Sequence, residues 1–502
     1  MSRLNNCLTA ICGDRVPLET ARKTFFFLLG IGIMLLVIAL PTPPPFYKGE
    51  EVIPLTQNAK IVMGVLCFAV IMWMTEAIPF PATSLSLIVL LHIMNVDSFG
   101  NLVKAGLGNQ SILFLMGAMG LSAAMTESGL ARRFMLWMLT RVGRRTDRIV
   151  LAFMLVGTLV SMWVTDMAVA AMLLPLGMSI LQGSGCKPLE SNFGRALMIG
   201  IVWGSLIGGT ATPAGCGANV LAMQYVRDIA KLDVSFAEWM AVGVPGALLM
   251  VPLGWFCLMK IFPPELKEIP MSLDSIRDEL RALGGLKAKE IRTLVVFVVM
   301  VALWLGGSHV APILGFKAPE AFVALLGFVL LFMPGLRVFE DWKDASRSID
   351  WGGLILIAGG ISAGMLLAST GAARWIAWGA LSEVGSLHPV LRVLAVITLV
   401  ELLKIFFSSN SVTGAVIMPL IIALAMDIGM NPWVLAGPAG IASSMAFIMV
   451  TSSPTNVIPY SSGYFTIAEF AKSGVVMTII AICCVTLSVS VFGSFAGMDI
   501  WH

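Results

Sequence analysis

The sequence predicts an all-α polytopic membrane protein with two inverted-topology repeats, paired re-entrant hairpins and broken helices, and about 11 transmembrane spans. The first reason is composition: 58% of the 502 residues are hydrophobic and 12% are charged, whereas soluble domains average about 25% charged residues. The second is that apolar segments of about 20 residues, long enough to cross a bilayer, recur along almost the whole chain. The third is a pair of matching polar clusters inside apolar segments.

These clusters are VTDMAVAAMLLP at 164–175 and SSNSVTGAVIMP at 408–419. Asp166 precedes Pro175 by the same interval that separates Asn410 from Pro419. Small polar residues between apolar turns predict a hairpin tip at membrane depth, where non-helical backbone is tolerated only inside protein or beside a watery cavity. One such segment in each half is typical of the binding site of a transporter built from repeats.

Composition and spacing disfavour several other classes. The eight cysteines show no metal-ligand spacing, and there are four histidines, so neither a zinc site nor a disulfide framework is expected. No grouping of nucleophile, histidine and acid indicates an enzyme, and no cofactor is expected. A net charge of +3 without a basic and aromatic run predicts no nucleic-acid partner. The first apolar segment lacks a small-residue cleavage site and is interpreted as a retained span.

The first half of the chain contains an N-terminal segment with the first span, followed by repeat 1. The predicted hairpin has Thr165 and Asp166 at its tip, and the predicted broken helix resumes at Asn219. An arginine-rich amphipathic segment before the hairpin is typical of a helix that lies along the membrane interface. The ranges are 1–58 for the first segment, 59–262 for repeat 1, 131–145 for the interfacial arm, 148–183 for the hairpin and 193–225 for the broken helix.

A polar linker at 263–290 divides the chain, and the second half repeats the order of elements. This self-similarity is interpreted as an internal repeat. The second broken helix is expected to be interrupted at 451–456, in the stretch TSSPTN. The ranges are 291–502 for repeat 2, 370–386 for its arm, 388–426 for its hairpin and 433–465 for its broken helix.

The basic residues predict the orientation in the membrane. Six arginines lie between residues 132 and 148, whereas the corresponding part of the second half, 370–392, has two. By the positive-inside rule, the N-terminus, the first arm and the linker are cytoplasmic, and the second arm is outside. We therefore expect a multi-pass protein of the plasma membrane (bacterial inner membrane) whose equivalent elements face opposite sides, an arrangement that suits alternating access.

Four polar clusters meet if the two repeats face each other: the hairpin tips at 165–166 and 408–411 and the helix breaks at 215–219 and 452–456. Their hydroxyl and carbonyl oxygens suit a hard cation such as sodium. The N-termini of half-helices carry the positive end of the helix dipole and favour an anion. The residues alone therefore predict a site for a small anion together with cations.

The stretch WMTEAIP at 73–79, both hairpin tips and both broken helices resemble the divalent anion:sodium symporter family, in the right order over nearly the whole chain. The resemblance implies a homodimer in the lipid bilayer that moves a small anionic substrate with sodium ions. It also implies a mobile part that carries both hairpins and a static scaffold. The family has a Ser-Asn-Thr signature at each hairpin tip and a proline-containing turn ending in Asn in each broken helix.

Carried over residue by residue, the resemblance implies two sets of site residues. The Asn of each signature contacts both sodium and substrate. The implied substrate-binding residues are Asp166, Cys216, Asn410, Ser411, Ser453 and Pro454. The implied sodium-binding residues are Ser161, Thr165, Asp166 and Gly215 in the first cation site, and Ser408, Asn410 and Ser452 in the second.

The first half departs from the family signature. Its tip reads Thr165-Asp166-Met167. Met167 therefore lacks the side-chain hydroxyl that would contact the substrate, and Cys216 offers a thiol where a hydroxyl is expected. An unpaired carboxylate at this depth is costly, so Asp166 is expected to hold a cation or to be protonated. Glu401 and Lys404, three residues apart, are expected to pair on one helix face.

The sequence thus predicts a secondary active transporter of small di-anionic solutes such as dicarboxylates, sulfonates or sulfate, sodium-coupled and working by alternating access. A proton-coupled carrier or an anion exchanger on the same fold is the alternative within the class. An ion channel is the alternative from another class. The identity of the substrate stays open.

Overall fold

The computed structural model describes residues 18–48, 50–270, 274–316 and 318–499, and most of these residues are in helices. The predicted cytoplasmic N-terminal segment at 1–17 and residues 271–273 of the linker lie outside this part. Among the described residues, nine helices are long and apolar enough to cross a membrane. The nine include Asp166–Gly183 and Asn410–Asp427, the second arms of the two hairpins. The predicted spans that form Phe80–Ile93, Glu320–Leu330 and Pro432–Ser443 are too short to be counted. The all-α polytopic fold is confirmed.

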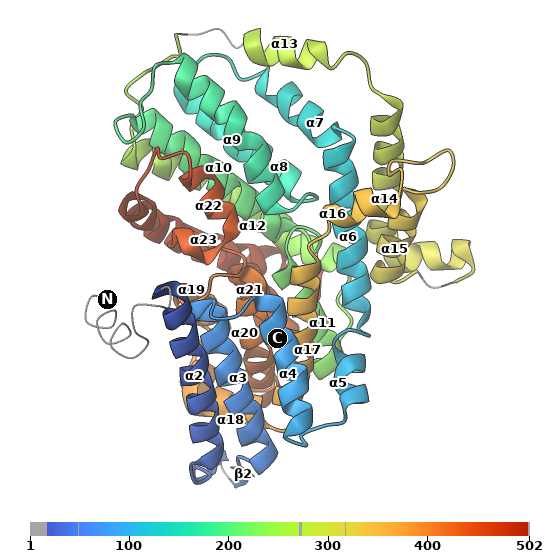
Figure 1. Cartoon of the computed structure of the whole chain (residues 1–502), viewed down its shortest axis with the longest axis vertical. Coiled ribbons are helices and arrows are strands. Elements are labelled where there is room, and N and C mark those ends of the chain that lie inside the picture. The colour runs from blue at the N-terminus through green and yellow to red at the C-terminus, as the bar shows by residue number, and fades with distance from the viewer. Residues whose placement is uncertain (1–17, 49, 271–273, 317, 500–502) are drawn as a thin grey trace.

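The first half contains one helical hairpin, one interrupted helix and the helices that flank them (Figure 1). A two-stranded antiparallel sheet connects its first two helices. The elements are α2 (Leu18–Ala39), β1 (Phe46–Lys48), β2 (Glu51–Ile53), α3 (Gln57–Thr75), α4 (Phe80–Ile93), α5 (Phe99–Ala105), α6 (Gln110–Glu127), α7 (Leu130–Leu139), α8 (Thr146–Ser161), α9 (Asp166–Gly183), α10 (Asn192–Ala211), α11 (Gly217–Ala230) and α12 (Phe236–Ile261).

The second half follows the same order. The elements are α13 (Asp274–Ala282), α14 (Ala288–Leu314), α15 (Glu320–Leu330), α16 (Trp342–Arg347), α17 (Trp351–Ser369), α18 (Ala372–Leu381), η1 (Ser382–Ser386), α19 (Pro389–Lys404), α20 (Asn410–Asp427), α21 (Pro432–Ser443), η2 (Val450–Ser452), α22 (Pro454–Tyr460), α23 (Ile467–Phe492) and η3 (Gly493–Ala496).

The two halves interlock crosswise. Hairpin helix α9 packs against α22 of the other half, and hairpin helix α20 packs against α11. The long helices α12 and α23 pack against each other, and each also contacts the first arm of the hairpin in its own half. The flanking helices exchange partners in the same way, because α6 packs against α15 and α17 against α4. This exchange brings both hairpin tips to one central region.

The two long helices, α12 and α23, begin with the same local sequence motif. Ser235 and Glu238 form a capping box at the start of α12, and Thr466 and Glu469 form one at the start of α23. In each box a hydroxyl and a carboxylate satisfy backbone N–H groups that the first turn leaves free. The two arms lie at opposite ends of the molecule, with α7 near the top of Figure 1 and α18 near the bottom. This is the arrangement that inverted repeats require.

The second broken helix differs from its prediction. Its first part, α21, ends at Ser443 and not at the expected break near 451. Residues 445–450 are apolar and were therefore expected to be helical. The amide of Asn456 donates hydrogen bonds to the carbonyls of Ala446 and Met449 at 2.7 and 3.0 Å. These bonds give the buried backbone partners outside a helix, so an apolar segment adopts a loop.

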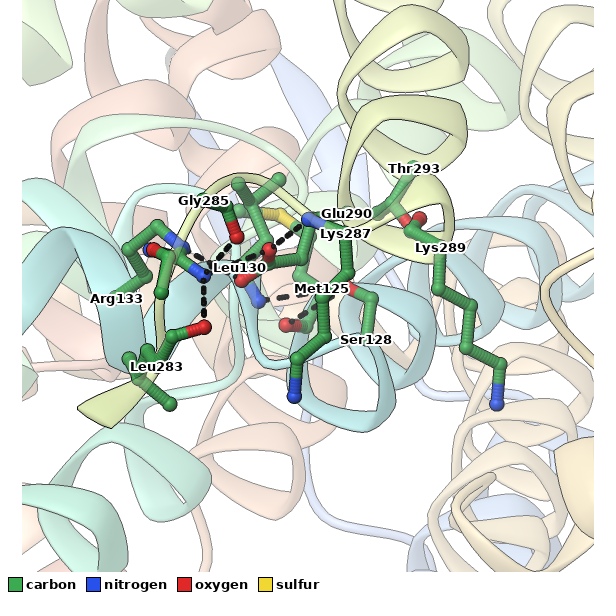
Figure 2. Close-up of polar contacts among 11 residues, drawn as sticks. Met125, Ser128, Leu130, Arg133, Leu283, Gly285, Lys287, Lys289, Glu290 and Thr293 are labelled. Atoms are coloured by element: carbon green, nitrogen blue, oxygen red, sulfur yellow. Dashed lines mark hydrogen bonds and ion pairs between the residues drawn. The ribbon is translucent and has the colours of Figure 1, made fainter. Parts of the chain in front are cut away.

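Arg133 lies in α7, the interfacial arm of the first half, and connects it to the linker and to α14 (Figure 2). Its guanidinium donates to both carboxylate oxygens of Glu290, at 2.7 and 3.0 Å. It also donates to the carbonyls of Leu283, Gly284 and Gly285. The Glu290 side chain is 2% exposed and that of Arg133 is 14% exposed. The planar fork of Arg133 thus fixes three consecutive linker carbonyls and a buried carboxylate at once.

We expect Arg133→Ala to lower the free energy of unfolding by about 3–5 kcal/mol, because it leaves the buried Glu290 carboxylate without its partner. The neighbouring Arg132→Ala is the control, since Arg132 pairs with Glu279 at the surface, where such pairs contribute less than about 1 kcal/mol. Thermal unfolding of the purified protein in detergent measures both changes. Equal midpoints for the two variants would contradict the assigned role of Arg133.

Candidate functional site

A cavity of about 370 Å³ lies where the two hairpin tips and the two helix breaks meet. It is lined from the first half by Thr165, Asp166 and Met167 of one tip and by 214–217 of the break. From the second half it is lined by 409–411 of the other tip and by 453–455 of the other break. Segments distant in sequence thus form one site, and the six predicted substrate-binding residues all line it.

The starts of α17 and the short helix α22 lie at the wall of this cavity and are capped by the side chains of Asp350 and Ser453. Three more helices begin there: α9 at Asp166, α11 at Gly217 and α20 at Asn410. The backbone N–H groups of a first helical turn have no partners within the helix, and the helix dipole makes these ends positive. No side chain caps α9 from Thr165, α11 from Cys216 or α20 from Ser409. The converging helix ends therefore favour a negatively charged ligand.

The charged side chains that line the cavity are Asp166 and Asp350. Asp350 caps α17, because its Oδ1 accepts the backbone N–H of Gly353 at 2.8 Å. Asp166 Oδ1 accepts the N–H of the next residue, Met167, also at 2.8 Å. No arginine or lysine is among the lining residues, so side chains in direct contact supply negative charge to a site whose helix ends favour an anion.

Two asparagines hold the interrupted helices in shape. Asn219 Nδ2 donates to the carbonyls of Gly209 and Thr212, at 2.8 Å each. Asn456 Nδ2 makes the corresponding pair of bonds in the second half, to Ala446 and Met449. The carbonyls of Thr212 and Met449 also accept the backbone N–H groups of Gly215 and Ser452. Among the described residues, no backbone N–H bonds to the carbonyls of Gly209 and Ala446, and a buried carbonyl without a donor is unfavourable. Each asparagine therefore makes the helix break possible.

The two asparagines differ at their side-chain oxygens. Asn219 Oδ1 accepts the hydroxyl of Ser444 at 3.1 Å, whereas Asn456 Oδ1 is buried without a partner. Ile207 stands before Asn219 by the same interval at which Ser444 stands before Asn456. The first half therefore has no hydroxyl to offer to Asn456.

The first predicted cation site is compact. Gly209 is so close to the tip that a Cβ on it would lie 3.6 Å from the Asp166 Cβ and 3.6 Å from the Gly215 carbonyl oxygen. A Cβ on Gly208 would lie 2.7 Å from the Ser161 Cβ. The glycine pair thus lets the helix approach three of the predicted ligands. The buried hydroxyl of Ser161 has no hydrogen-bond partner, and Thr165 lines the cavity.

The second predicted cation site is arranged differently. Asn410 Oδ1 is buried without a partner, while its Nδ2 lies 3.7 Å from Cys216 Sγ. Ser408 donates to the carbonyl of Trp73 at 3.4 Å, and Ser452 donates to the carbonyl of Lys404 at 3.4 Å. Neither Ser408 nor Ser452 is among the residues that line the cavity. The structure therefore brings these residues near one another without a cluster of free hydroxyls.

Sequence reasoning missed the part of the cavity wall that comes from outside the hairpins. Ser122 of α6 lines the cavity and accepts the N–H of Thr165 at 3.3 Å. Ser348 and Asp350 line it from the start of α17. These residues stand in segments without a hairpin or break signature. The one signal was the sequence Asp350-Trp-Gly-Gly before an apolar run, which is typical of a helix N-cap.

The profile of the family described as "Sodium:sulfate symporter transmembrane region" matches residues 22–498. The chain belongs to this family. The prediction of a membrane transporter, and not an enzyme, is thereby confirmed. A curated relative, the "Sodium-dependent dicarboxylate transporter SdcS" of Staphylococcus saprophyticus, is 29% identical over 454 residues, 87% of this chain and 86% of the relative. The SdcS of Staphylococcus aureus strain NCTC 8325 is 28% identical over 450 residues, 85% of each chain.

Two solved structures share the fold. The YdaH transporter of Alcanivorax borkumensis aligns with a TM-score of 0.59 and 14% identity, covering 96% of this chain and 99% of that one. MtrF of Neisseria gonorrhoeae aligns with a TM-score of 0.54 and 17% identity, covering 97% and 98%. At these identities the comparison concerns the arrangement of helices, and it agrees with the predicted fold class.

We expect Asn219→Ala and Asn456→Ala each to destabilise the protein, because each leaves one buried carbonyl, that of Gly209 or that of Ala446, without a donor at a cost of about 1–3 kcal/mol. Asn101→Ala is the control, since Asn101 bonds to Asp97 at the exposed end of the molecule and such surface changes stay within about 0.5 kcal/mol. Thermal unfolding in detergent compares the three. A midpoint for Asn219→Ala equal to that of Asn101→Ala would overturn the assigned bracing role.

Proposed function

We propose that this member of the sodium:sulfate symporter family is a sodium-coupled secondary active transporter of small organic dianions, with dicarboxylates as the first class to test. The observation that carries the proposal is the convergence on one cavity of two carboxylates and of three helix N-termini whose N-cap residues make no side-chain capping bond. Helix ends attract an anion, but Asp166 repels it unless a cation lies between them. A site built in this way binds its anion and its cation together.

The size of the cavity supports a small solute. Its volume of about 370 Å³ is many times the share of one water molecule in the liquid, about 30 Å³. The wall combines polar groups of the two tips with the apolar side chains of Leu115, Ala118 and Met119. A dicarboxylate with a few carbon atoms between its carboxylates matches this combination of polar and apolar groups. The family and the printed names of the relatives, which specify sodium and dicarboxylate, support the same solute and ion.

In this proposal Asp166 belongs to the first cation site, together with Ser161, Thr165 and the backbone of Gly215. A negative carboxylate, a hydroxyl and a freed carbonyl are oxygen ligands of the kind a hard cation takes. Asn410 and Ser411 of the second tip, with Ser453 and the turn at Pro454, bind the anion from the other side. Cys216 and Met167 give the first half fewer hydrogen-bond donors than the second.

In this proposal the two hairpins and the two broken helices move together as one rigid body. They move against a scaffold that includes α3, α4, α14 and α15, and this movement exposes the solutes to each face of the membrane in turn. The packing of α9 on α22 and of α20 on α11 supports such a body. The N-terminus, the arm α7 and the linker are cytoplasmic in this proposal. Arg133 joins α7 to the linker, and the excess of basic residues near α7 supports that orientation.

Succinate uptake into proteoliposomes tests the function when sodium and pH gradients are imposed separately. We expect uptake to follow the inward sodium gradient. Uptake driven equally by a proton gradient alone would favour the proton-coupled alternative, and identical rates without any gradient would overturn coupled transport. Self-exchange of succinate in the absence of net uptake would indicate an exchanger.

Asp166→Asn tests the first cation site. The neutral amide keeps the shape of the tip but removes the charge that binds the cation, so half-maximal uptake should require about tenfold more sodium, equivalent to about 1.4 kcal/mol. The control is Asp341→Asn, because Asp341 caps α16 outside the cavity and asparagine caps a helix equally well. Unchanged sodium dependence in Asp166→Asn would exclude Asp166 from the cation site.

Restoring hydroxyls in the first half should strengthen anion binding. Met167→Thr combined with Cys216→Ser adds donors to a charged ligand at about 1.5–3 kcal/mol each, so the half-saturating succinate concentration should fall about tenfold or more. Met178→Thr makes the same substitution on the same helix, outside the residues that line the cavity, and should leave it unchanged. The same half-saturating succinate concentration in the wild type, the double variant and Met178→Thr would contradict the proposed contacts.

A further inference from the structure

Lys404 is a buried lysine beside the second hairpin tip. It is the last residue of α19 and is 2% exposed. Its Nζ donates to the carbonyl oxygen of Ser452 at 3.0 Å, and the hydroxyl of Ser452 donates back to the carbonyl of Lys404 at 3.4 Å. The ammonium group is therefore fixed at the helix break that follows α21, and it does not reach the surface.

The expected pairing of Lys404 with Glu401 is wrong. The two residues, both well within the described part of the chain, form no ion pair within 4.0 Å. Glu401 is 3% exposed, and its Oε1 has no hydrogen-bond partner. Sequence spacing placed both residues on one helix face, but the lysine chain extends past the end of α19 and its ammonium binds a backbone carbonyl instead.

The carbonyl that Lys404 contacts stands at the second predicted cation site. It comes from Ser452, where the break leaves a backbone oxygen available to a hard cation, and it lies close to the tip that carries Asn410. The unpartnered Oδ1 of Asn410 is a further oxygen of this region. An ammonium group and a sodium ion both bind to oxygen atoms of this kind. The Ser452 carbonyl oxygen is thus already bonded to a positive charge that is part of the protein, the ammonium of Lys404.

The first half has no such lysine. Gly215 stands before Asn219 by the same interval at which Ser452 stands before Asn456, and Val160 stands before Asp166 as Lys404 stands before Asn410. The first tip carries the carboxylate of Asp166 instead. The two half-sites therefore carry ionisable side chains of opposite sign.

We propose that the ammonium group of Lys404 takes the place of a sodium ion in the second cation site, so that the transporter carries one fewer sodium ion in each cycle. This inference rests on the proposed sodium-coupled function. The tethered cation also supplies one positive charge beside a cavity whose lining carries the carboxylates of Asp166 and Asp350. An uncompensated charge at membrane depth is unfavourable, and Lys404 offsets one of the negative charges that meet there.

The sodium dependence of succinate uptake into proteoliposomes tests the proposal. For the wild type we expect a Hill coefficient of about 1, from the first site alone, and for Lys404→Ala about 2, because removal of the side chain opens a second linked site. Lys404→Met fills the same space without charge, and its uptake should fall at least tenfold without recovery at high sodium. Lys60→Ala is the matched control, since Lys60 is also buried and donates to a carbonyl, that of Leu40, at 2.6 Å.

The outcomes separate the two proposals. Absence of sodium-dependent succinate uptake in the wild type would overturn the proposed function. Sodium-dependent uptake with the same Hill coefficient in the wild type and in Lys404→Ala would overturn the role of Lys404 alone. Should Lys404→Ala fail to fold, the reversal potential of wild-type uptake decides, because it reports the charge moved in each cycle. One sodium ion per dianion is expected, and two or more would contradict the inference.

Discussion

The structure depends on the requirement that backbone groups inside a membrane protein find partners within the protein. Two helices are interrupted at the cavity, and Asn219 and Asn456 each donate to two carbonyls at the interruption. In each pair one carbonyl, that of Gly209 or that of Ala446, has no backbone donor within the described part of the chain. Because these carbonyls are bonded, the breaks can stay in place inside an apolar surrounding. The helices that resume after them, α11 and α22, then begin at the wall of the cavity. The binding site is a consequence of this bracing.

The same architecture is used twice with different chemistry. The first tip carries a carboxylate at Asp166, near an unpartnered hydroxyl of Ser161 and the backbone of Gly215. The second tip carries Asn410, with the ammonium of Lys404 bonded at the adjacent break. Symmetry of the fold therefore coexists with opposite charges. In our account the first half recruits a mobile cation, whereas the second half contains one that is covalently attached.

Much of the fold could be predicted from sequence, because hairpin tips, helix breaks and basic segments leave local patterns. The clusters 165–166, 215–219, 408–411 and 452–456 were predicted to meet. Residues 165–166, 215–217, 409–411 and 453–455 of these clusters line one cavity, and the others do not line it. Contacts between distant segments left no local pattern. The break after Ser443 was missed because its bonds come from Asn456, and the partner of Lys404 was missed because it lies on another element. Ser122, Ser348 and Asp350 were missed for the same reason.

The central claim is that the two hairpin tips share one anion between a cation site and a tethered ammonium. An experimental structure of the protein in nanodiscs with sodium and succinate tests it most directly. We expect density for succinate between Asn410 and the first tip, one sodium ion beside Asp166, and the Lys404 ammonium still bound to the carbonyl of Ser452. Succinate bound elsewhere, or a sodium ion at the Ser452 carbonyl with Lys404 displaced, would contradict the account.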